Sequence, residues 1–427
     1  MSDKSPINAL LLSKSDNGGG AAIAANRINA AVIQSGVNSQ MWVDNKRTDD
    51  SSISSHSGKL TGKIAKIRPA LNSVPRFLTR SPATQYESFN WVPSAWPSRV
   101  NASDCDVVHL HWYNSEMLSI SDIAKISKPK VQTLHDMWSF CGSEHLATDS
   151  RWQTGYDLPV SGGLLDIDLQ KWTWKRKLKH WLTPHQLVAP SQWMADCVKA
   201  SYLFNSWPVC VIGNPIDTDF WKPLDKYACR EHLGIGKNKK IVLFGAIGGT
   251  RSLNKGFDLL LEALSIMPKQ ELEKIVLVIF GQSRSGIDMG GLQIETFFTG
   301  HLQDQLSLRL VYNAADLLVS SSRIESFGQT TAEAHACGVP VVAFDDTGCA
   351  DIVSHKKTGY LAKHCDVEDL AAGISWTLYR KSGDLQSELS AMARAARENI
   401  VSRFGYDIVG KKYAEIYSKV IQSSGTQ

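Results

Sequence analysis

Two glutamates, Glu325 and Glu333, lie eight positions apart around the start of a predicted helix. The helix is expected over residues 330–337, because the Gly-Val-Pro that follows favours a left-handed cap and cannot continue a helix. The next apolar run, residues 339–344, has the length of a buried strand. One carboxylate is therefore expected in the loop before the helix and the other on its second turn, where both can accept hydrogen bonds from hydroxyl groups.

The residues between the two glutamates are suited to bind an anion. Ser326, Phe327 and Gly328 would lie at the helix entrance, where free backbone N–H groups and the helix dipole attract negative charge. A pocket for an anion beside two carboxylates that accept from hydroxyls fits a sugar nucleotide, which carries a diphosphate as well as sugar hydroxyls.

A lysine in a glycine-rich segment offers a second group for phosphate. Lys255 follows the segment G-A-I-G-G-T-R-S-L-N, which is expected at the exit of a strand. Its ammonium is a point charge suited to phosphate, and Arg251 in the same segment adds a forked donor. The alternative is a solvated loop with two ordinary surface cations. Preorganised donors of this kind can neutralise a diphosphate without a metal ion.

Length and composition predict a two-domain protein of the cytoplasm. A chain of 427 residues exceeds the size at which one core keeps growing. Its eight cysteines form no C-x-x-C pair and fit reduced thiols rather than a disulfide framework. The apolar run 7–12 is too short for a signal peptide or a membrane span. A net charge of +4 neither demands nor excludes an anionic partner.

Alternating apolar strands and helices predict an α/β fold with a boundary at the Asn214-Pro215 turn. Polar residues end two of the strands, on the sheet edge where open α/β folds bind ligands. The segment 45–98 is polar and broken by prolines, and we interpret it as a partly helical insertion. The expected strands are residues 7–12, 39–43, 106–111, 130–135, 187–189, 209–212, 240–244, 275–280, 296–299, 317–320 and 340–344. The expected helices are residues 21–35, 192–200, 367–380, 386–401 and 406–421, with others beginning at Gly256, Gln303 and Thr330.

Five segments together resemble one known family, the retaining GT-B glycosyltransferases of family 4. They are S-D-N-G-G-G-A-A-I-A-A-N-R from residue 15, A-P-S-Q-W-M-A-D from 189, V-I-G-N-P-I-D-T-D-F-W-K-P from 211, N-K-G-F-D-L-L-L-E-A-L from 254, and the E-x7-E pattern followed by G-V-P-V-V. Their order is the family's order, and they cover most of the chain. The resemblance implies two facing Rossmann-like domains. Residues 1–213, joined by a last helix in 405–427 that crosses back, would bind the acceptor, and residues 214–404 would bind the nucleotide sugar.

The resemblance also implies roles for single residues. Lys255 and Arg251 would contact the diphosphate together with the backbone of Ser326, Phe327 and Gly328. Glu333 would hold the ribose, and Glu325 and His135 would orient the donor sugar. The loop of Gly18, Gly19 and Gly20 would lie on the acceptor side. Two departures stand out: Ala246 occupies a position where many members have arginine, and the segment T-G-C-A-D-I-V, which resembles the family's Gly-Gly-x-x-Glu segment, departs from it by having Cys349 and Asp351.

The histidines and aspartates do not predict a metal site. His135 ends a strand, and the alternative to a role in the site is a histidine bonded to a backbone carbonyl. His109 and His111 form H-x-H without a nearby third ligand. D-x-D occurs three times, at residues 104–106, 166–168 and 217–219, and never where a strand-end nucleotide site would use it. We therefore expect neither a metal nor a cofactor, with the sugar nucleotide as substrate.

A basic segment rich in tryptophan, residues 171–181, allows two interpretations. On a helix, Trp174, Leu178 and Trp181 form one stripe. The stripe could rest on the anionic surface of the inner membrane, which would suit a lipid-linked acceptor. Alternatively it packs on the first domain, which we slightly prefer. No motif supports binding of nucleic acid.

The resemblance implies transfer of a hexose from an NDP-sugar to a hydroxyl of a glycan or lipid-linked acceptor, with retention and with the diphosphate assisting deprotonation. T-L-H-D-M-W-S-F-C-G and W-Q-T-G are similar to segments of bacterial enzymes that build exopolysaccharide, O-antigen or colanic acid. One alternative is an epimerase or a phosphorylase on the same fold. Another is a non-catalytic scaffold that binds sugar nucleotides, against which the presence of both Glu325 and Glu333 argues.

Overall fold

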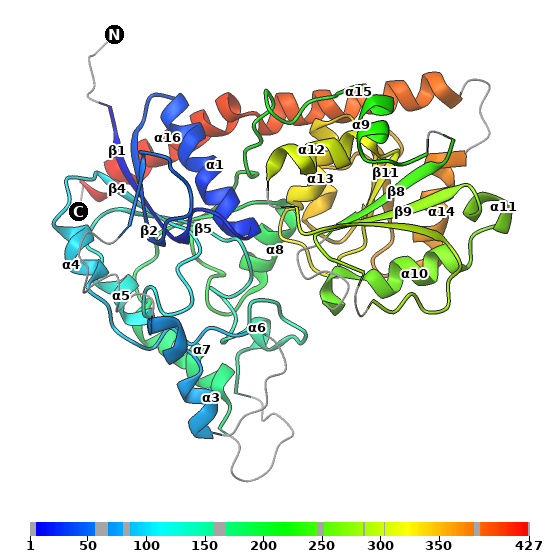
Figure 1. The fold of residues 1–427 in the computed structure, drawn as a ribbon. Coiled ribbons are helices and arrows are strands. Elements are labelled where there is room, and N and C mark those ends of the chain that lie inside the picture. The colour runs from blue at the N-terminus through cyan, green and yellow to red at the C-terminus, as the bar shows by residue number, and fades with distance from the viewer. Residues whose placement is uncertain are drawn as a thin grey trace. The chain divides into compact units, whose positions relative to one another are not determined.

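The computed structural model describes residues 6–55, 67–79, 86–157, 167–236, 238–245, 252–284, 287–302, 304–379 and 385–425. The chain forms two compact units, drawn in Figure 1. Unit 1 consists of Met1–Pro215 together with Tyr406–Gln427, and unit 2 is Ile216–Gly405. No helix in the described part of the chain combines the length and the apolar character needed to cross a membrane.

Unit 1 is built on a seven-stranded sheet in the order β3-β2-β1-β4-β5-β6-β7, in which every paired strand is parallel. Its central strands are short apolar runs buried on both faces, as parallel sheets require. The strands are β1 (Asn8–Ser15), β2 (Asn38–Asn45), β3 (Ile53–Ser54), β4 (Val107–Leu110), β5 (Lys130–Thr133), β6 (Gln186–Ala189) and β7 (Val209–Val211).

Helices from both ends of the chain cover one face of this sheet. The first helix, α1, lies beside the last, α16, and both pack on the core formed by β1, β2 and β4 (Figure 1). The final helix therefore belongs to unit 1 although unit 2 precedes it in the sequence. The helices of unit 1 are α1 (Gly20–Gln34), α3 (Val74–Thr79), α4 (Trp96–Asn101), α5 (Ile120–Lys125), α6 (Arg151–Thr154), α7 (Leu169–His180), α8 (Gln192–Ala200) and α16 (Tyr406–Ser424).

The tryptophan-rich segment forms α7 and packs inside unit 1. Trp174 and Trp181 are only 2% and 7% exposed, and the Trp181 indole donates to the Ile120 carbonyl at 2.9 Å. Lys177 is fully buried and donates to three backbone carbonyls, those of Trp138, Cys141 and Gly142. The stripe that would have rested on a membrane is thus used in packing, so the structure favours the second interpretation.

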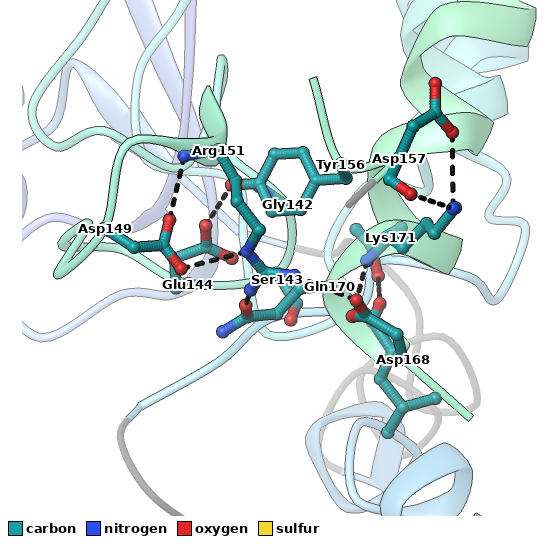
Figure 2. A network of polar contacts seen from close by, with 12 residues as sticks. Gly142, Ser143, Glu144, Asp149, Arg151, Tyr156, Asp157, Asp168, Gln170 and Lys171 are labelled. Carbon is teal, nitrogen blue, oxygen red and sulfur yellow. Dashed lines mark hydrogen bonds and ion pairs between the residues drawn. The ribbon is translucent and has the colours of Figure 1, made fainter. Parts of the chain in front are cut away.

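A polar network ties the loop after β5 to the start of α7 (Figure 2). The Arg151 guanidinium contacts the Asp149 and Asp168 carboxylates at 2.9 and 2.8 Å and lies over the Tyr156 ring. The Tyr156 hydroxyl donates to the buried Glu144 carboxylate. Charged pairs and a stacked guanidinium therefore order this loop in addition to its buried apolar side chains.

Unit 2 repeats the alternation on a six-stranded parallel sheet in the order β10-β9-β8-β11-β12-β13. Helices α10 and α14 cover one face, and α9, α12, α13 and α15 lie on the other (Figure 1). The strands are β8 (Lys240–Gly245), β9 (Ile275–Phe280), β10 (Glu295–Gly300), β11 (Leu317–Ser320), β12 (Val341–Phe344) and β13 (Gly359–Ala362). The helices are α9 (Lys226–His232), α10 (Phe257–Ser265), α11 (Lys269–Leu272), α12 (Gln305–Ala314), α13 (Gln329–Ala336), α14 (Val367–Tyr379) and α15 (Leu385–Phe404), with short 3₁₀ turns η1 (Leu253–Lys255) and η2 (Gly348–Asp351).

The α/β class and the two Rossmann-like sheets confirm the fold expected from the sequence. The strands β3 and β13 were not expected, because β3 has only two residues and the sequence of β13, Gly-Tyr-Leu-Ala, is short and has no clear alternation. The helices α4, α5, α6, α9 and α11 were missed too, and each has at most seven residues. Described parts of the expected insertion are ordered by polar contacts, such as those from the amides of Trp91 and Val92 to the buried Glu116 carboxylate.

We predict that Gly410→Ala destabilises unit 1 by about 1–3 kcal/mol, because overpacking at a close contact forces the backbone to move. A Cβ atom at Gly410 on α16 would lie 2.1 Å from the Ala31 carbonyl oxygen on α1. Thermal unfolding followed by circular dichroism measures the loss. The matched control is Gly425→Ala, where the nearest atoms are 3.8 Å away. Equal melting temperatures for the two variants would contradict the prediction.

Candidate functional site

The residues expected to bind a nucleotide lie at one edge of the unit 2 sheet. Strands β8, β11 and β12 are parallel neighbours, so the segments after them meet at their carboxyl ends. Lys255 follows β8, Glu325 follows β11, and the turn η2 follows β12. The topology therefore brings together parts of the chain that are up to about a hundred residues apart.

Asn254 fastens the lysine turn to the loop after β11. Its side-chain amide donates to the Ile324 carbonyl at 2.9 Å and accepts from the Ile324 amide at 3.0 Å. Its own carbonyl accepts from the Arg323 amide at 2.7 Å. Gly256 completes the junction, because a Cβ atom there would lie 1.9 Å from the Ser321 carbonyl oxygen. This sequence position requires glycine both for that contact and for its positive φ of 64°.

The junction places the Lys255 ammonium 2.8 Å from the Glu325 carboxylate. Their side chains are 33% and 21% exposed, so the pair faces solvent without being fully hydrated. The Glu325 carboxylate raises the pKa of Lys255 above its ordinary value, against the opposing effect of burial. The lysine is therefore charged at neutral pH and oriented, which is what a phosphate-binding point charge requires.

The start of α13 presents backbone amides beside this pair. Gly328 precedes the helix with a positive φ of 97°, and no side chain caps the helix start. The Phe327 side chain is buried and packs edge-on against Phe404, with ring centroids 5.5 Å apart. This packing anchors the turn in the core of unit 2. The amide of Gly348 donates to the Glu325 carbonyl at 2.7 Å and fixes the loop that contains Ser326. The expected role of these residues through the backbone is compatible with this geometry.

Glu333 lies on α13, within the buried part of unit 2. It is only 5% exposed, and its Oε2 atom accepts a hydrogen bond from the Tyr312 hydroxyl at 2.9 Å. Two groups of expected site residues thus share this region: the Lys255–Glu325 pair and the helix that carries Glu333. The simple alternative for Glu333, a solvated helix face, does not hold.

The departure at Cys349 has a structural explanation. Its side chain is buried, with Sγ 3.4 Å from the Thr331 hydroxyl and 3.6 Å from the Ser320 hydroxyl. A Cβ atom at Gly328 would lie 2.7 Å from this sulfur. Cys349 therefore fills the space beneath the start of α13.

Arg251, which was expected to donate hydrogen bonds to the diphosphate, lies outside the described residues. The same holds for Ala246, which stands where many members of the family have arginine.

His135 follows β5 in unit 1 and pairs with a second histidine. Its Nε2 atom lies 3.0 Å from Nδ1 of His111, and the two rings are stacked with centroids 5.3 Å apart. Burial lowers the pKa of His135 to about 4. The sequence left open a bond from His135 to a backbone carbonyl. The structure instead pairs His135 with His111, and both imidazoles are neutral.

The H-x-H pair is occupied by hydrogen bonds between side chains. His109 is buried, with Nδ1 2.7 Å from the Tyr417 hydroxyl and Nε2 2.7 Å from the Thr133 hydroxyl. Burial lowers the pKa of both His109 and His111 well below the ordinary value, and the neighbouring histidines add to the effect. Within the described residues, no group of three or more His, Cys, Asp or Glu side chains is arranged to hold a metal ion.

Next to His135, Asp136 organises a cluster that the sequence did not reveal. Its Oδ2 atom accepts from the Trp112 indole at 2.8 Å and lies 2.6 Å from Nδ1 of His145. His145 in turn contacts the Ser88 hydroxyl at 2.8 Å. These partners come from three separate segments, and the sequence pattern does not indicate contacts between them.

The glycine-rich loop after β1 lies against the end of β2. Gly18 has a positive φ of 98°, and a Cβ atom there would lie 2.2 Å from the exposed Arg47 guanidinium. Asp16 is buried and accepts from the backbone amides of Arg47 and Thr48 at 2.8 and 2.9 Å. Gly19 and Gly20 begin α1 with open space around them. The loop is thus accessible, as an acceptor-side loop requires, and lies in a different unit from Lys255.

Two glycosyltransferase family models match the chain, one in each half. Residues 51–220 match the family model Glycosyltransferase Family 4, and residues 225–398 match the family model Glycosyl transferases group 1. The chain is 31% identical over 252 residues to D-inositol 3-phosphate glycosyltransferase 2 of Catenulispora acidiphila, which covers 56% of each protein. It spans about half the length of the curated relatives it matches.

Solved structures resemble the whole chain in fold. Sucrose-phosphate synthase from Thermosynechococcus elongatus has a TM-score of 0.67 at 17% identity and covers 98% of this chain and 100% of its own. Anabaena HepE, solved in complex with UDP-glucose, has a TM-score of 0.63 at 18% identity and covers 97% of this chain and 100% of its own. At these identities the likeness establishes the GT-B fold.

We predict that His335 on α13 makes unit 2 sensitive to acid. Its side chain is fully buried, and burial lowers its pKa from 6.5 to about 3. Because the unfolded chain binds a proton below pH 6.5 and the folded site does not, stability falls as the pH drops from 6.5 toward 3. By pH 5 the loss amounts to about 2 kcal/mol.

The test compares the fall in melting temperature between pH 7 and pH 5 for the natural chain and for His335→Leu. The melting temperature of His335→Leu is expected to fall less between pH 7 and pH 5 than that of the natural chain, whatever the stability of the variant at pH 7. His301→Leu, at an exposed histidine, serves as the control. An unchanged acid sensitivity in His335→Leu would show that the buried imidazole does not carry this linkage.

Proposed function

We propose that this chain is a retaining glycosyltransferase that moves a sugar from a nucleoside diphosphate sugar to a hydroxyl group. The observation that carries the proposal is the oriented Lys255–Glu325 pair beside the amide-rich start of α13. Both lie in the segment that matches the group 1 glycosyltransferase model. A cation and the backbone amides of a helix start favour a diphosphate, and a nearby carboxylate favours the hydroxyls of a sugar.

Donor binding divides between three groups of unit 2. The Lys255 ammonium and the amides around Gly328 would neutralise the charge that develops on the departing diphosphate. Glu333 would accept hydrogen bonds from the two ribose hydroxyls. Glu325, already bonded to Lys255, would hold the donor sugar by its remaining lone pairs. Because Anabaena HepE was solved in complex with UDP-glucose, this sugar nucleotide is a reasonable first donor to try.

The reaction would proceed on one face of the sugar. The acceptor oxygen bonds to the anomeric carbon while the bond from that carbon to the phosphate oxygen breaks. The acceptor's proton passes to the departing phosphate oxygen, so charge and atoms balance and the configuration is retained. His135 would take part as a neutral hydrogen-bonding group, since burial lowers its pKa to about 4.

Two classes of acceptor follow from different observations. The segments from Thr133 and from Trp152, through their similarity to polysaccharide-assembly enzymes, favour a glycan or lipid-linked saccharide in the synthesis of bacterial surface polysaccharide. The names of the relatives, an inositol 3-phosphate glycosyltransferase and a sucrose-phosphate synthase, favour a phosphorylated polyol or sugar. We propose the first class and include the second in the acceptor assay. The eight free cysteines suit a reducing cytoplasm, where nucleotide sugars are made.

The proposal is tested first by binding. UDP, GDP and ADP are compared by thermal shift and calorimetry, since a ligand of the folded state raises its melting temperature. We expect one of them to bind and Lys255→Met to weaken it by about 10- to 100-fold, as expected when a charge-assisted contact is lost. Lys269→Met, at a lysine of unit 2 that is 89% exposed, is the matched control.

Activity is then measured with the matching nucleotide sugar and both classes of acceptor. Release of the nucleoside diphosphate, with the anomeric configuration of the product read by NMR, identifies the reaction. Unchanged nucleotide affinity in Lys255→Met, or an inverted product, would contradict the proposal. Binding without any turnover would favour the scaffold alternative, and interconversion of free nucleotide sugars would favour the epimerase.

A further inference from the structure

A buried tyrosine on α12 faces the carboxylate that is expected to hold the ribose. Tyr312 is fully buried, and its ring lies edge-on against Trp221 and Phe280, with centroids 5.7 Å away in both cases. Two edge-to-face aromatic contacts leave the ring little freedom. The position of the phenolic oxygen is therefore set by the core of unit 2 rather than by solvent.

The hydroxyl of this fixed ring donates to Oε2 of Glu333 at 2.9 Å. A glutamate has three rotatable side-chain bonds, so a carboxylate on a helix is not oriented by its backbone alone. The hydrogen bond from Tyr312 on α12 fixes Oε2 of Glu333 on α13. The carboxylate can then rotate only about this fixed oxygen, which restricts its orientation. A carboxylate oriented in this way is prepared to accept from two neighbouring hydroxyls at once.

We propose that Tyr312 is a positioning residue that makes the donor site selective for ribonucleotides over deoxyribonucleotides. The inference rests on the proposed function, because it assumes that Glu333 contacts the ribose. Its physical basis is that a carboxylate held in one orientation cannot adjust to a ligand that lacks one of the hydroxyls. When a hydroxyl of the ligand is missing, an oriented carboxylate that is 5% exposed cannot turn toward water to recover the lost bond.

Packing alone would not require the hydroxyl. A phenylalanine at position 312 would make the same two aromatic contacts, so Tyr312→Phe keeps the packing and removes the bond to Glu333. Unit 2 offers a matched control in Tyr379, whose hydroxyl donates to the backbone carbonyl of Glu271 at 2.9 Å. Tyr379→Phe removes a hydrogen bond of the same kind that does not involve Glu333.

The experiment measures the ratio of two affinities in the full chain. UDP, or GDP or ADP if it binds better, is titrated by calorimetry alongside its 2′-deoxy and 3′-deoxy analogues. The natural chain should prefer the ribonucleotide by about tenfold or more, a ratio typical of a site that recognises a hydroxyl. In Tyr312→Phe the ratio should fall to about threefold or less, while Tyr379→Phe should keep the natural ratio.

A double-mutant comparison separates positioning from loss of structure. Glu333→Gln should weaken the preference at least as much as Tyr312→Phe, and adding Tyr312→Phe to it should change the ratio no further. An undiminished preference in Tyr312→Phe would overturn the inference, and so would an equal loss of affinity for all three ligands. If the natural chain binds none of the nucleotides, the proposed function itself fails. If it binds them without distinguishing the analogues, only the role of the Tyr312–Glu333 pair fails.

Discussion

The candidate site depends on one ion pair and on the residue that fixes its geometry. Lys255 and Glu325 come from loops after two different strands, and their contact of 2.8 Å exists because Asn254 bonds to the backbone on both sides of Ile324. Without that junction, a lysine on a glycine-rich loop would be a flexible surface charge, and holding it in place would cost side-chain entropy on binding. The junction orders the lysine when the chain folds, so this entropy is lost before any ligand binds.

The two units differ in the charge of the polar side chains at the edges of their sheets. Unit 2 exposes a cation and backbone amides at its sheet edge, whereas the histidines at the corresponding edge of unit 1 are kept neutral by burial. A histidine whose pKa is lowered to about 4 is a weak base at neutral pH. Within the proposed function, this difference supports a reaction in which the departing phosphate, rather than a protein base, receives the proton of the acceptor. Charge stabilisation would then be the main task of unit 2.

Local sequence was sufficient to predict most elements of the site but not their mutual contacts. The helix α13, its glycine start and the strand after it follow from glycine, proline and a short apolar run, so their positions were predicted within two residues. The roles of Asn254 and Tyr312 were not predicted, because each depends on a partner that lies more than twenty residues away in the sequence. Such pairings become visible only when the sheet order is known.

Helix α7 is a second case in which the local sequence predicts an element but not its contacts. The spacing of Trp174 and Trp181 correctly indicated one apolar stripe, yet a stripe alone does not say whether it meets protein or lipid. What decides the matter is Lys177, which points inward to three carbonyls of the loop after β5. Lys177, which helical spacing places beside the two tryptophans, is buried because the loop supplies acceptors that replace water.

The central claim is that a nucleoside diphosphate binds at the junction of Lys255 with the start of α13. Hydrogen–deuterium exchange of the full chain with and without UDP, or the base that binds best, tests it most directly. We predict that the ligand slows exchange in peptides that contain residues 253–256 and 325–333, with smaller changes elsewhere in unit 2. Protection confined to other segments, despite saturating ligand, would contradict it.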